Sequence, residues 1–418
     1  MPTKVLIALV TLALLLMAGL AAAYFVLRPD RPEGGLDTEL AGVSLFEGTE
    51  PEEEPETTET TAETKPQERC WPNFGGNPRR TLALPDVRLG LPGKRVWRRV
   101  MSDVMEYPPS FCDGVVYVNL EHGLTVAVDA ETGRFIWTKR MEDFTASTPA
   151  IDGPRLIVSS HAGTVTALRR KDGKLLWRLR VGGKVESSPV VVDGTAYFGT
   201  TEGRLFAVWS KSGRVRWAYN TGGRINASPS VIGERVCIST YAGSILCLNR
   251  RDGTRLWITF VERDVFRMES FYASPSSDGR RLFTVARTGK VVALSLFTGR
   301  VLWTYHQGAL AYATPAIAEG TIYVAAFDGG IRALRSENGR LLWQRSVPGR
   351  ILGHGLVVGG LVFFSTLEER TYGLQRKTGR IVWRADRGKY APGIATDRYY
   401  YFSLNGSLLR YRGHGGIR

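Results

Sequence analysis

Short runs of alternating or β-branched apolar residues, separated by glycine-containing turns, make up most of this chain. Between Ser187 and Asn220, for example, four such runs are separated by the turn dipeptides DG, EG and SG. Alternation with a period of two is typical of strands with one buried face, and these dipeptides favour tight hairpins. Each stretch of this kind therefore predicts a four-stranded antiparallel meander.

A series of tryptophans shows that the meander is repeated at a fixed period. Neighbouring members of the series lie 40 residues apart, except for one interval of 46. A four-stranded repeat of about 40 residues is typical of a propeller blade, because a small sheet with two apolar faces must pack against neighbours on both sides. The members of the series are Trp97, Trp137, Trp177, Trp217, Trp257, Trp303, Trp343 and Trp383.

The two ends of the repeat region complement each other. Complete meanders run from about Pro109 to Ala385, and residues 394–411 supply three further strands without a tryptophan. The missing outer strand of this last blade is available as Lys94–Val100, around Trp97. We therefore predict an all-β fold, an eight-bladed β-propeller of four-stranded antiparallel blades over residues 94–412, closed by pairing the N-terminal strand with the last blade.

Most tryptophans of the series end a common phrase, as in ETGRFIW, SENGRLLW and KTGRIVW. This TGxxxW phrase resembles the pyrroloquinoline-quinone-type, or tryptophan-docking, propeller repeat, and the WD dipeptide of the other common propeller repeat is missing. The resemblance implies that each tryptophan docks between neighbouring blades. In plan the chain is similar to the BamB-type outer-membrane assembly scaffolds, but a transmembrane helix and an acidic stretch take the place of a lipidated cysteine.

The N-terminus carries a long apolar run from Val5 to Leu27, interrupted only by Thr11 and Gly19. At about 1.5 Å per residue, a helix of this length crosses a bilayer core of about 30 Å. We predict that residues 1–28 form a transmembrane anchor; the alternative is a signal peptide cleaved after Ala21-Ala22-Ala23. The resemblance then implies a single-pass cell-membrane protein with an extracytoplasmic propeller, or a secreted protein if cleavage occurs.

Charge divides the remaining chain into two parts. Residues 29–68 are rich in Glu, Thr and Pro and carry a net charge of −11, which predicts a disordered acidic tether; the alternative is an acidic strip that docks on the basic domain. From Arg69 onward, the net charge is +24. Residues 69–93 are expected to be a lead-in segment and residues 413–418 a tail. A basic propeller favours an acidic protein partner. Nucleic acid is not expected, because no basic run is interleaved with aromatic residues.

Signatures of enzymatic chemistry are missing from the sequence. A quinoprotein dehydrogenase of the resembling family would need adjacent cysteines, calcium ligands and long enclosing loops, but the chain has no Cys-Cys pair and only one long connection. There is no GxSxG, HExxH or phosphate-binding glycine loop. We predict a monomeric, non-enzymatic protein-binding scaffold of the cell envelope, with no catalytic residue, metal or cofactor. The alternatives are a quinone- or ligand-binding propeller with redox activity and a cell-wall polysaccharide binder.

Two cysteines flank one predicted hairpin, VCISTYAGSILCL. A three-residue loop, Tyr241-Ala242-Gly243, with glycine in the left-handed conformation, pairs Cys237 with Cys247. At a non-hydrogen-bonded position, paired Cα atoms lie about 4.5 Å apart, which permits a disulfide. The alternative is a pair of buried free thiols. Cys70 and Cys112 are a second, weaker candidate pair.

The binding surface is expected at one mouth of the central channel, where each connection from an outer to the next inner strand emerges. Aromatic and arginine side chains that converge on a rigid rim are typical anchors of interfaces. The alternative is a polar, water-filled mouth without a ligand. Aligning the connections on the prolines that open the inner strands brings together Glu106, Glu186, Asn226, Tyr272 and Tyr312, with Tyr390 from the last blade. Two residues earlier lie Lys184, Arg224 and Arg350, and the long insertion adds Arg263, Phe266, Arg267 and Phe271.

Overall fold

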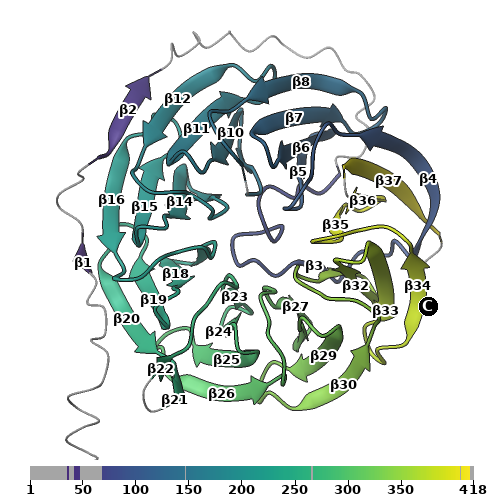
Figure 1. Cartoon of the computed structure of the whole chain (residues 1–418). Helices are drawn as coiled ribbons and strands as arrows, with labels where there is room; N and C mark the ends of the chain where they lie inside the picture. The colour runs from purple at the N-terminus through teal and green to yellow at the C-terminus, as the bar shows by residue number, and fades with distance from the viewer. Residues whose placement is uncertain are drawn as a thin grey trace, which may run out of the picture.

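A computed structural model describes residues 35–36, 42–47, 68–145, 147–264, 267–404 and 406–414 of the chain. These residues form a ring of eight antiparallel sheets around a central axis (Figure 1), which confirms the predicted all-β, eight-bladed propeller. The predicted anchor, residues 1–28, lies outside the described residues. Among the residues that are described, no helix has the length and apolar character needed to cross a membrane.

The blades follow one another along the chain, and each runs from an inner strand at the channel to an outer strand at the rim. Blades 1 to 4 consist of β5 (Ser110–Cys112), β6 (Val115–Leu120), β7 (Leu124–Asp129) and β8 (Phe135–Arg140); β9 (Ala150–Asp152), β10 (Arg155–Ser159), β11 (Thr164–Arg169) and β12 (Leu175–Arg180); β13 (Val190–Val192), β14 (Thr195–Gly199), β15 (Arg204–Trp209) and β16 (Val215–Asn220); and β17 (Ser230–Ile232), β18 (Arg235–Ser239), β19 (Ser244–Asn249) and β20 (Arg255–Phe260).

The hairpin of β21 (Glu262–Asp264) and β22 (Arg267–Met268) is inserted before blade 5. Blades 5 to 7 consist of β23 (Ser276–Ser277), β24 (Arg281–Val285), β25 (Lys290–Ser295) and β26 (Val301–His306); β27 (Ala316–Ala318), β28 (Thr321–Ala325), β29 (Gly330–Arg335) and β30 (Leu341–Ser346); and β31 (Leu356–Val358), β32 (Leu361–Thr366), β33 (Arg370–Gln375) and β34 (Ile381–Ala385).

Blade 8 joins the two ends of the propeller. Its sheet has the order β35 (Gly393–Ala395), β36 (Tyr399–Leu404), β37 (Ser407–His414) and β4 (Leu91–Val100). Strand β4 lies antiparallel to β37, with Ser407 opposite Val100 and Arg410 opposite Trp97. The predicted closure is therefore confirmed, although β4 begins at Leu91 and β37 continues into the predicted tail as far as His414.

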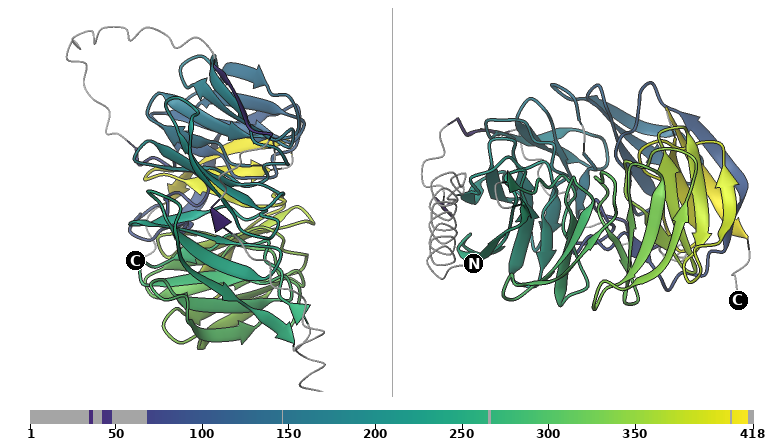
Figure 2. Two further views of the ribbon diagram at one scale, coloured as in Figure 1. Left: turned by 90° about the vertical axis from the view of Figure 1, so that its left-hand side faces the viewer. Right: turned by 60° about the horizontal axis from the view of Figure 1, so that its bottom comes forward.

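Two short strands lie within the range that we expected to be a disordered tether. Strand β2 (Ser44–Glu47) pairs antiparallel with the outer strand β12, and β1 (Gly35–Leu36) pairs with β16. Both lie on the outside of the ring (Figure 2), and Leu45 packs against the core between the blades. The expectation of a tether without secondary structure does not hold for these residues, because the exposed edge of an outer strand offers unpaired backbone groups.

The tryptophans hold neighbouring blades together. The indole nitrogen of Trp177 donates to the carbonyl of Ser210 in the next blade at 2.8 Å, and the equivalent bond is made by every member of the series from Trp97 to Trp343. Each of these rings covers the glycine of the next blade's TGxxxW phrase. At Gly213, for example, φ is +72° and an added Cβ would lie 2.7 Å from the Trp177 ring. The glycine of each phrase therefore leaves the space in which the tryptophan of the preceding blade packs.

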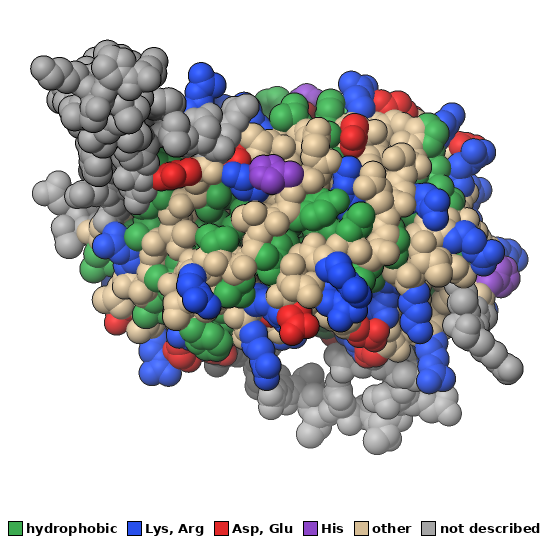
Figure 3. Space-filling view, turned by 90° about the horizontal axis from the view of Figure 1, so that it is seen from below, with side chains coloured by type: hydrophobic (Ala, Val, Ile, Leu, Met, Phe, Trp, Pro, Cys, Tyr) green, Lys and Arg blue, Asp and Glu red, His purple; other side chains and the backbone are tan. Residues whose placement is uncertain are grey.

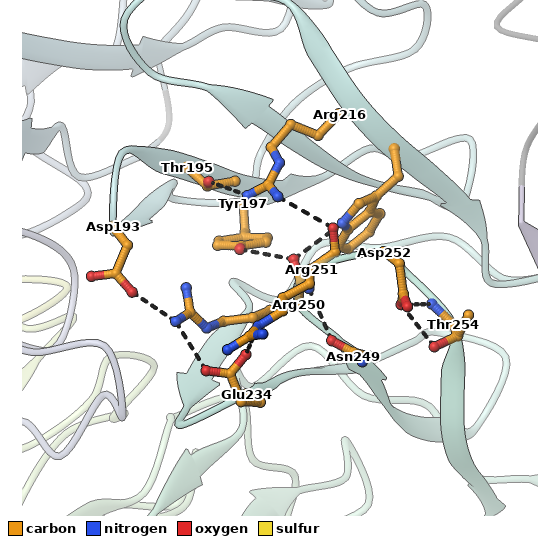
Figure 4. A network of polar contacts seen from close by, with 11 residues as sticks. Asp193, Thr195, Tyr197, Arg216, Glu234, Asn249, Arg250, Arg251, Asp252 and Thr254 are labelled. Atoms are coloured by element: carbon orange, nitrogen blue, oxygen red, sulfur yellow. Dashed lines mark hydrogen bonds and ion pairs between the residues drawn. The ribbon is translucent and has the colours of Figure 1, made fainter.

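Partly buried arginines add polar contacts at some of these interfaces. Arg250 of blade 4 lies between Asp193 and Glu234, at 2.6 and 3.3 Å, and its carbonyl accepts a hydrogen bond from the Tyr197 hydroxyl (Figure 4). Arg170 repeats the arrangement with Asp113, and Arg376 repeats it with Glu319. Part of the positive charge of the propeller thus stabilises contacts between blades.

Both cysteine pairs lie at bonding distance in the structure. Cys237 and Cys247 are opposite one another in β18 and β19, with a Cα–Cα distance of 4.0 Å, and form a disulfide. The hairpin has the expected loop, since the Thr240 amide bonds the Ser244 carbonyl and Gly243 has φ of +83°. A second disulfide joins Cys70 to Cys112.

Candidate functional site

The lead-in, residues 69–90, runs inside the ring and crosses its centre (Figure 1). Trp71, Phe74 and Leu82 of this segment are buried, and β3 (Ala83–Leu84) lies parallel to the inner strand β31. The disulfide from Cys70 ties its beginning to blade 1. The protein's own chain therefore occupies the interior of the ring.

Backbone hydrogen bonds fasten the lead-in to the inner strands. An inner strand has one unpaired edge, and its N–H groups need acceptors when they are buried. Carbonyl groups of the lead-in accept these bonds from blade after blade. The donors are the amides of Phe111, Ile151, Val231, Ser277, Ile317 and Val357.

One buried arginine supports the lead-in at the channel axis. The guanidinium of Arg80 is fully buried and donates to the carbonyls of Pro229 at 2.6 Å, Phe74 at 2.6 Å and Ser188 at 3.0 Å. Burial lowers the pKa of Arg80 to about 9, which still leaves the side chain cationic at neutral pH. It thereby joins the lead-in to blades 3 and 4.

A ring of hydroxyl groups lies at the start of the inner strands. The backbone amide of the residue just before the proline that opens the inner strand of one blade donates to the Ser or Thr hydroxyl at the same position of the next blade, 2.8 to 3.1 Å away. The chain of bonds passes through Thr148, Ser188, Ser228, Ser274 and Thr314. The equivalent residues of blades 7, 8 and 1 are His354, Ala391 and Pro108, which carry no hydroxyl group. The ring is thus interrupted on one side of the channel.

A pocket of about 300 Å³ opens at the mouth where the ring is interrupted. We call this end of the channel, formed by the outer-to-inner connections and the turns between second and third strands, the connection mouth. Phe74 of the lead-in lines the pocket together with residues of these connections and turns. Others that line it are Glu106, Tyr107, Asn226, Tyr241, Tyr272, Arg287, Tyr312, His354 and Tyr390.

Aromatic rings form a connected chain within the pocket. His354 and Tyr107 both meet the Phe74 ring edge to face, with centroids 4.9 and 6.4 Å away. The hydroxyl groups of Tyr107 and Tyr272 are hydrogen-bonded, and Tyr272 meets Tyr312 edge to face at 6.1 Å. Burial raises the pKa of Tyr107 and of Tyr272, so both hydroxyls remain neutral.

Glu106 is the acidic group of the pocket. Burial, together with the smaller effect of the nearby carboxylates of Glu121 and Glu186, raises the pKa of Glu106 to about 7. Burial lowers the pKa of His354 to about 3, so this imidazole adds no positive charge. Arg287 is the single Lys or Arg side chain among the described residues that line the pocket, and it is exposed. The carboxylates of Glu121 and Glu186 thus oppose the ionisation of Glu106.

The raised pKa predicts a stability that falls with pH. A carboxyl group whose pKa rises from 4.5 to about 7 on folding stabilises the protein below pH 4.5, and this contribution is lost as the pH rises through 7. We expect Glu106→Gln to remove about 2 to 3 kcal/mol of the pH-dependent change, measured by urea unfolding at about pH 5 and about pH 8. Glu202→Gln, on an exposed turn, is the control. An unchanged pH profile in Glu106→Gln would contradict the assignment.

The structure brings several of the predicted binding residues together. Asn226, Tyr272, Tyr312 and Tyr390 line the pocket, as does Glu106. Glu186 accepts a hydrogen bond from the Asn226 amide group and pairs with Arg224 at 3.4 Å. Lys184 and Arg350 are exposed on the rim, and Arg350 pairs with Glu368 at 2.7 Å.

Other predicted residues lie on the inserted hairpin. Arg263 is in β21 and Arg267 is exposed in β22, whereas Phe266 lies outside the described residues. Phe271 is fully buried and forms a bridge with Ala286, so it is a core residue and not part of the binding surface. The buried Glu269 pairs with Lys290 at 3.1 Å, which ties the end of the insertion to blade 5.

Sequence reasoning missed three contributors to the site: Phe74, Tyr107 and His354. Two features of the sequence could have pointed to them. Trp71, just ahead of Phe74, falls outside the 40-residue series, and blade 7 has Gly355 where most other blades have proline. Gly353 allows this connection to approach Tyr390 closely, because an added Cβ would overlap the Tyr390 carbonyl.

A model of the family described as outer membrane protein assembly factor BamB matches residues 87–265 and 243–388. The chain belongs to this family. None of the curated proteins matches it. Among solved structures, BamB from Moraxella catarrhalis is 16% identical with a TM-score of 0.66, over 78% of this chain and 99% of that one.

Enzymes share the fold of this BamB-family propeller. The quinohemoprotein alcohol dehydrogenase of Comamonas testosteroni is 14% identical with a TM-score of 0.68, over 84% of this chain and 81% of that one. A europium-containing methanol dehydrogenase is also 14% identical with a TM-score of 0.68, over 79% of this chain and 87% of that one. At these identities the likeness shows the fold alone.

The residues of the BamB-family pocket do not fit the quinone cofactor of such enzymes. Pyrroloquinoline quinone carries three carboxylates, which need several cationic partners, whereas Arg287 is the one Lys or Arg side chain among the described residues that line the pocket and Glu106 adds a carboxyl group. Neither disulfide joins adjacent cysteines, since their sequence separations are 42 and 10. The two carboxylate-containing clusters with metal-ligand spacing among the described residues, around Asp103 and Asp113, do not include a residue that lines the pocket.

Proposed function

We propose that this protein is a non-enzymatic scaffold of the cell envelope that binds a protein partner at the connection mouth. The main support for the proposal is the position of the lead-in, which occupies the interior of the ring. The loops of the connection mouth therefore form a surface around a pocket. Membership of the BamB family supports a role in outer-membrane assembly.

The rim of the mouth has the chemistry of an interface. Exposed arginines, Arg224 and Arg350, lie on connections of this mouth that also carry partly buried tyrosines or adjoin them, and Arg267 is exposed on the inserted hairpin at the outer edge of the ring (Figure 1). Arginine and tyrosine are common anchors of protein interfaces. Lysine and arginine also occur with hydrophobic side chains over the lower edge of the ring (Figure 3). A partner with an acidic contact surface would be attracted to this basic exterior.

We further propose that residues 1–28 anchor the protein by a single span and that the propeller is extracytoplasmic. The apolar run from Val5 to Leu27 and the family membership support this topology. Protease added to intact spheroplasts should digest the propeller, and a protected propeller would contradict the topology. An N-terminus at Tyr24 in the mature protein would show cleavage in place of anchoring.

The binding surface can be tested by neutralising one arginine of the mouth and one of the inserted hairpin. Arg224→Gln with Arg267→Gln should reduce the partner recovered by crosslinking in native membranes about fivefold or more, without changing the thermal stability. Glutamine avoids placing a second carboxylate beside Glu186, which lies 3.4 Å from Arg224. The recovered partner is identified and quantified by mass spectrometry.

The matched control carries the same change of charge on the opposite face, as Arg134→Gln with Arg214→Gln, both exposed near the turns that precede the outer strands. This control should recover the partner at the wild-type level. Equal losses in both double variants would show a non-specific charge effect, and unchanged recovery in the mouth variant would move the binding surface elsewhere.

A further inference from the structure

The pocket at the connection mouth contains buried polar atoms without hydrogen-bond partners among the described residues. The side-chain oxygen Oδ1 of Asn226 and the ring nitrogen Nε2 of His354 are both buried and unpaired. Asn226 is 5% exposed and His354 is 6% exposed, and both residues line the pocket. Buried polar atoms are normally satisfied, so unpaired ones facing a cavity indicate where a ligand donates.

The walls of the pocket suit a positive charge. Five tyrosines and Phe74 line it, and their ring faces carry a partial negative charge. Glu106 lines the same space and makes no hydrogen bond or ion pair with another described residue, whereas Glu186 is already engaged by Asn226 and Arg224. Glu106 is therefore a carboxylate available to a ligand.

The size of the pocket limits what enters. Its volume of about 300 Å³ is at the lower end of the range of about 300–1,000 Å³ for ligand pockets. Phe74 of the lead-in forms part of the wall, so the lead-in limits the space that is available to a ligand. A small cationic head group with a short apolar body matches these dimensions.

We propose that this pocket binds an organic ammonium ion, with Glu106 as the counter-ion and Tyr107, Tyr272 and Tyr312 providing the aromatic wall. This goes beyond the proposed scaffold function, because it assigns a ligand class to the interior of the mouth and does not depend on the rim arginines. The same chemistry is available from a free small amine or from a lysine side chain of a protein.

Isothermal titration of the full-length protein with choline tests the proposal. The neutral isostere 3,3-dimethylbutan-1-ol has the same shape without the charge, and we expect choline to bind about tenfold more tightly. Glu106→Gln should weaken choline binding about tenfold, and Tyr312→Leu should weaken it severalfold, whereas Tyr312→Phe should retain it because the ring remains.

Glu202→Gln is the matched control, since Glu202 is an exposed carboxylate on a turn of the same mouth that does not line the pocket. It should bind choline like the wild type. Equal affinity for choline and its neutral isostere, or equal losses in Glu106→Gln and Glu202→Gln, would overturn the proposal.

A second titration distinguishes the two sources of the ammonium group. An N-acetyl-lysine amide and its norleucine analogue are titrated in parallel with choline. Binding of choline alone assigns a free amine, whereas displacement of choline by the lysine derivative and not by the norleucine one assigns a protein side chain. If neither choline nor the lysine derivative binds, the pocket is not an ammonium site.

Discussion

Deletion of β4, residues Leu91–Val100, is expected to prevent the chain from forming a closed, monomeric propeller. The deletion leaves the outer edge of β37 unpaired and removes Trp97, which bonds the Ala130 carbonyl of blade 1 at 2.9 Å. Leu91 and Trp97 also pack against the hydrophobic core. The loss should exceed about 5 kcal/mol, comparable with the whole stability of many domains. Size-exclusion chromatography and thermal unfolding would measure the effect.

Deletion of β2, Ser44–Glu47, is the matched control, because it also removes a strand at a blade's outer edge but leaves all eight blades with four strands. We expect this variant to remain a monomer with nearly unchanged stability. A circular permutant that carries residues 68–100 behind β37 through a flexible linker should recover the closed ring. A stable, cooperative monomer without β4 would refute the shared blade.

Replacement of Arg80 by methionine is expected to destabilise the propeller by about 3 to 5 kcal/mol. The guanidinium bonds three carbonyls at the channel axis, and methionine would leave those of Phe74, Ser188 and Pro229 buried without donors. Removal of the buried charge offsets part of this cost, since no carboxylate pairs with it among the described contacts. Urea unfolding measures the difference.

Arg79→Met is the control for this substitution, because Arg79 precedes Arg80 in the same segment and is exposed. Its effect should be within about 0.5 kcal/mol, as for most surface changes. If Arg80→Met were as stable as Arg79→Met, the lead-in would not depend on its buried arginine. Loss of folding in Arg80→Met alone would agree with the expectation.

The regular part of the fold could be predicted from the sequence because most blades repeat the same pattern of apolar residues, turn glycines and a tryptophan. The tryptophan spacing gave the number of blades, and the missing strand of the last blade pointed to residues near Trp97. The glycine of the Tyr241-Ala242-Gly243 loop gave the register of one hairpin and hence the pairing of Cys237 with Cys247. These features depend on short-range patterns, which a single sequence displays.

The lead-in and the short strand β2 could not be predicted in this way. Their conformations come from unpaired strand edges elsewhere in the ring, as at Phe111 for Trp71 and at β12 for Ser44–Glu47. The mouth was predicted in part: alignment placed Glu106 beside the tyrosines, but the carboxylate field inside a basic propeller is a local property. A net charge of +15 does not reveal it.

The lead-in and β4 also affect the order in which contacts form as the protein folds. Carbonyl groups of the lead-in accept hydrogen bonds from the inner strands of blades 1, 2 and 4 to 7. The strand that follows it, β4, pairs with β37, which lies more than 300 residues later in the chain. Contacts between such distant segments form slowly, because the ends of a long loop must first meet. In a chain that emerges from its N-terminus, the lead-in can therefore bond successive blades as they form, whereas β4 has no partner until β37 has been made. Synthesis of blade 8 is the step that permits the ring to close.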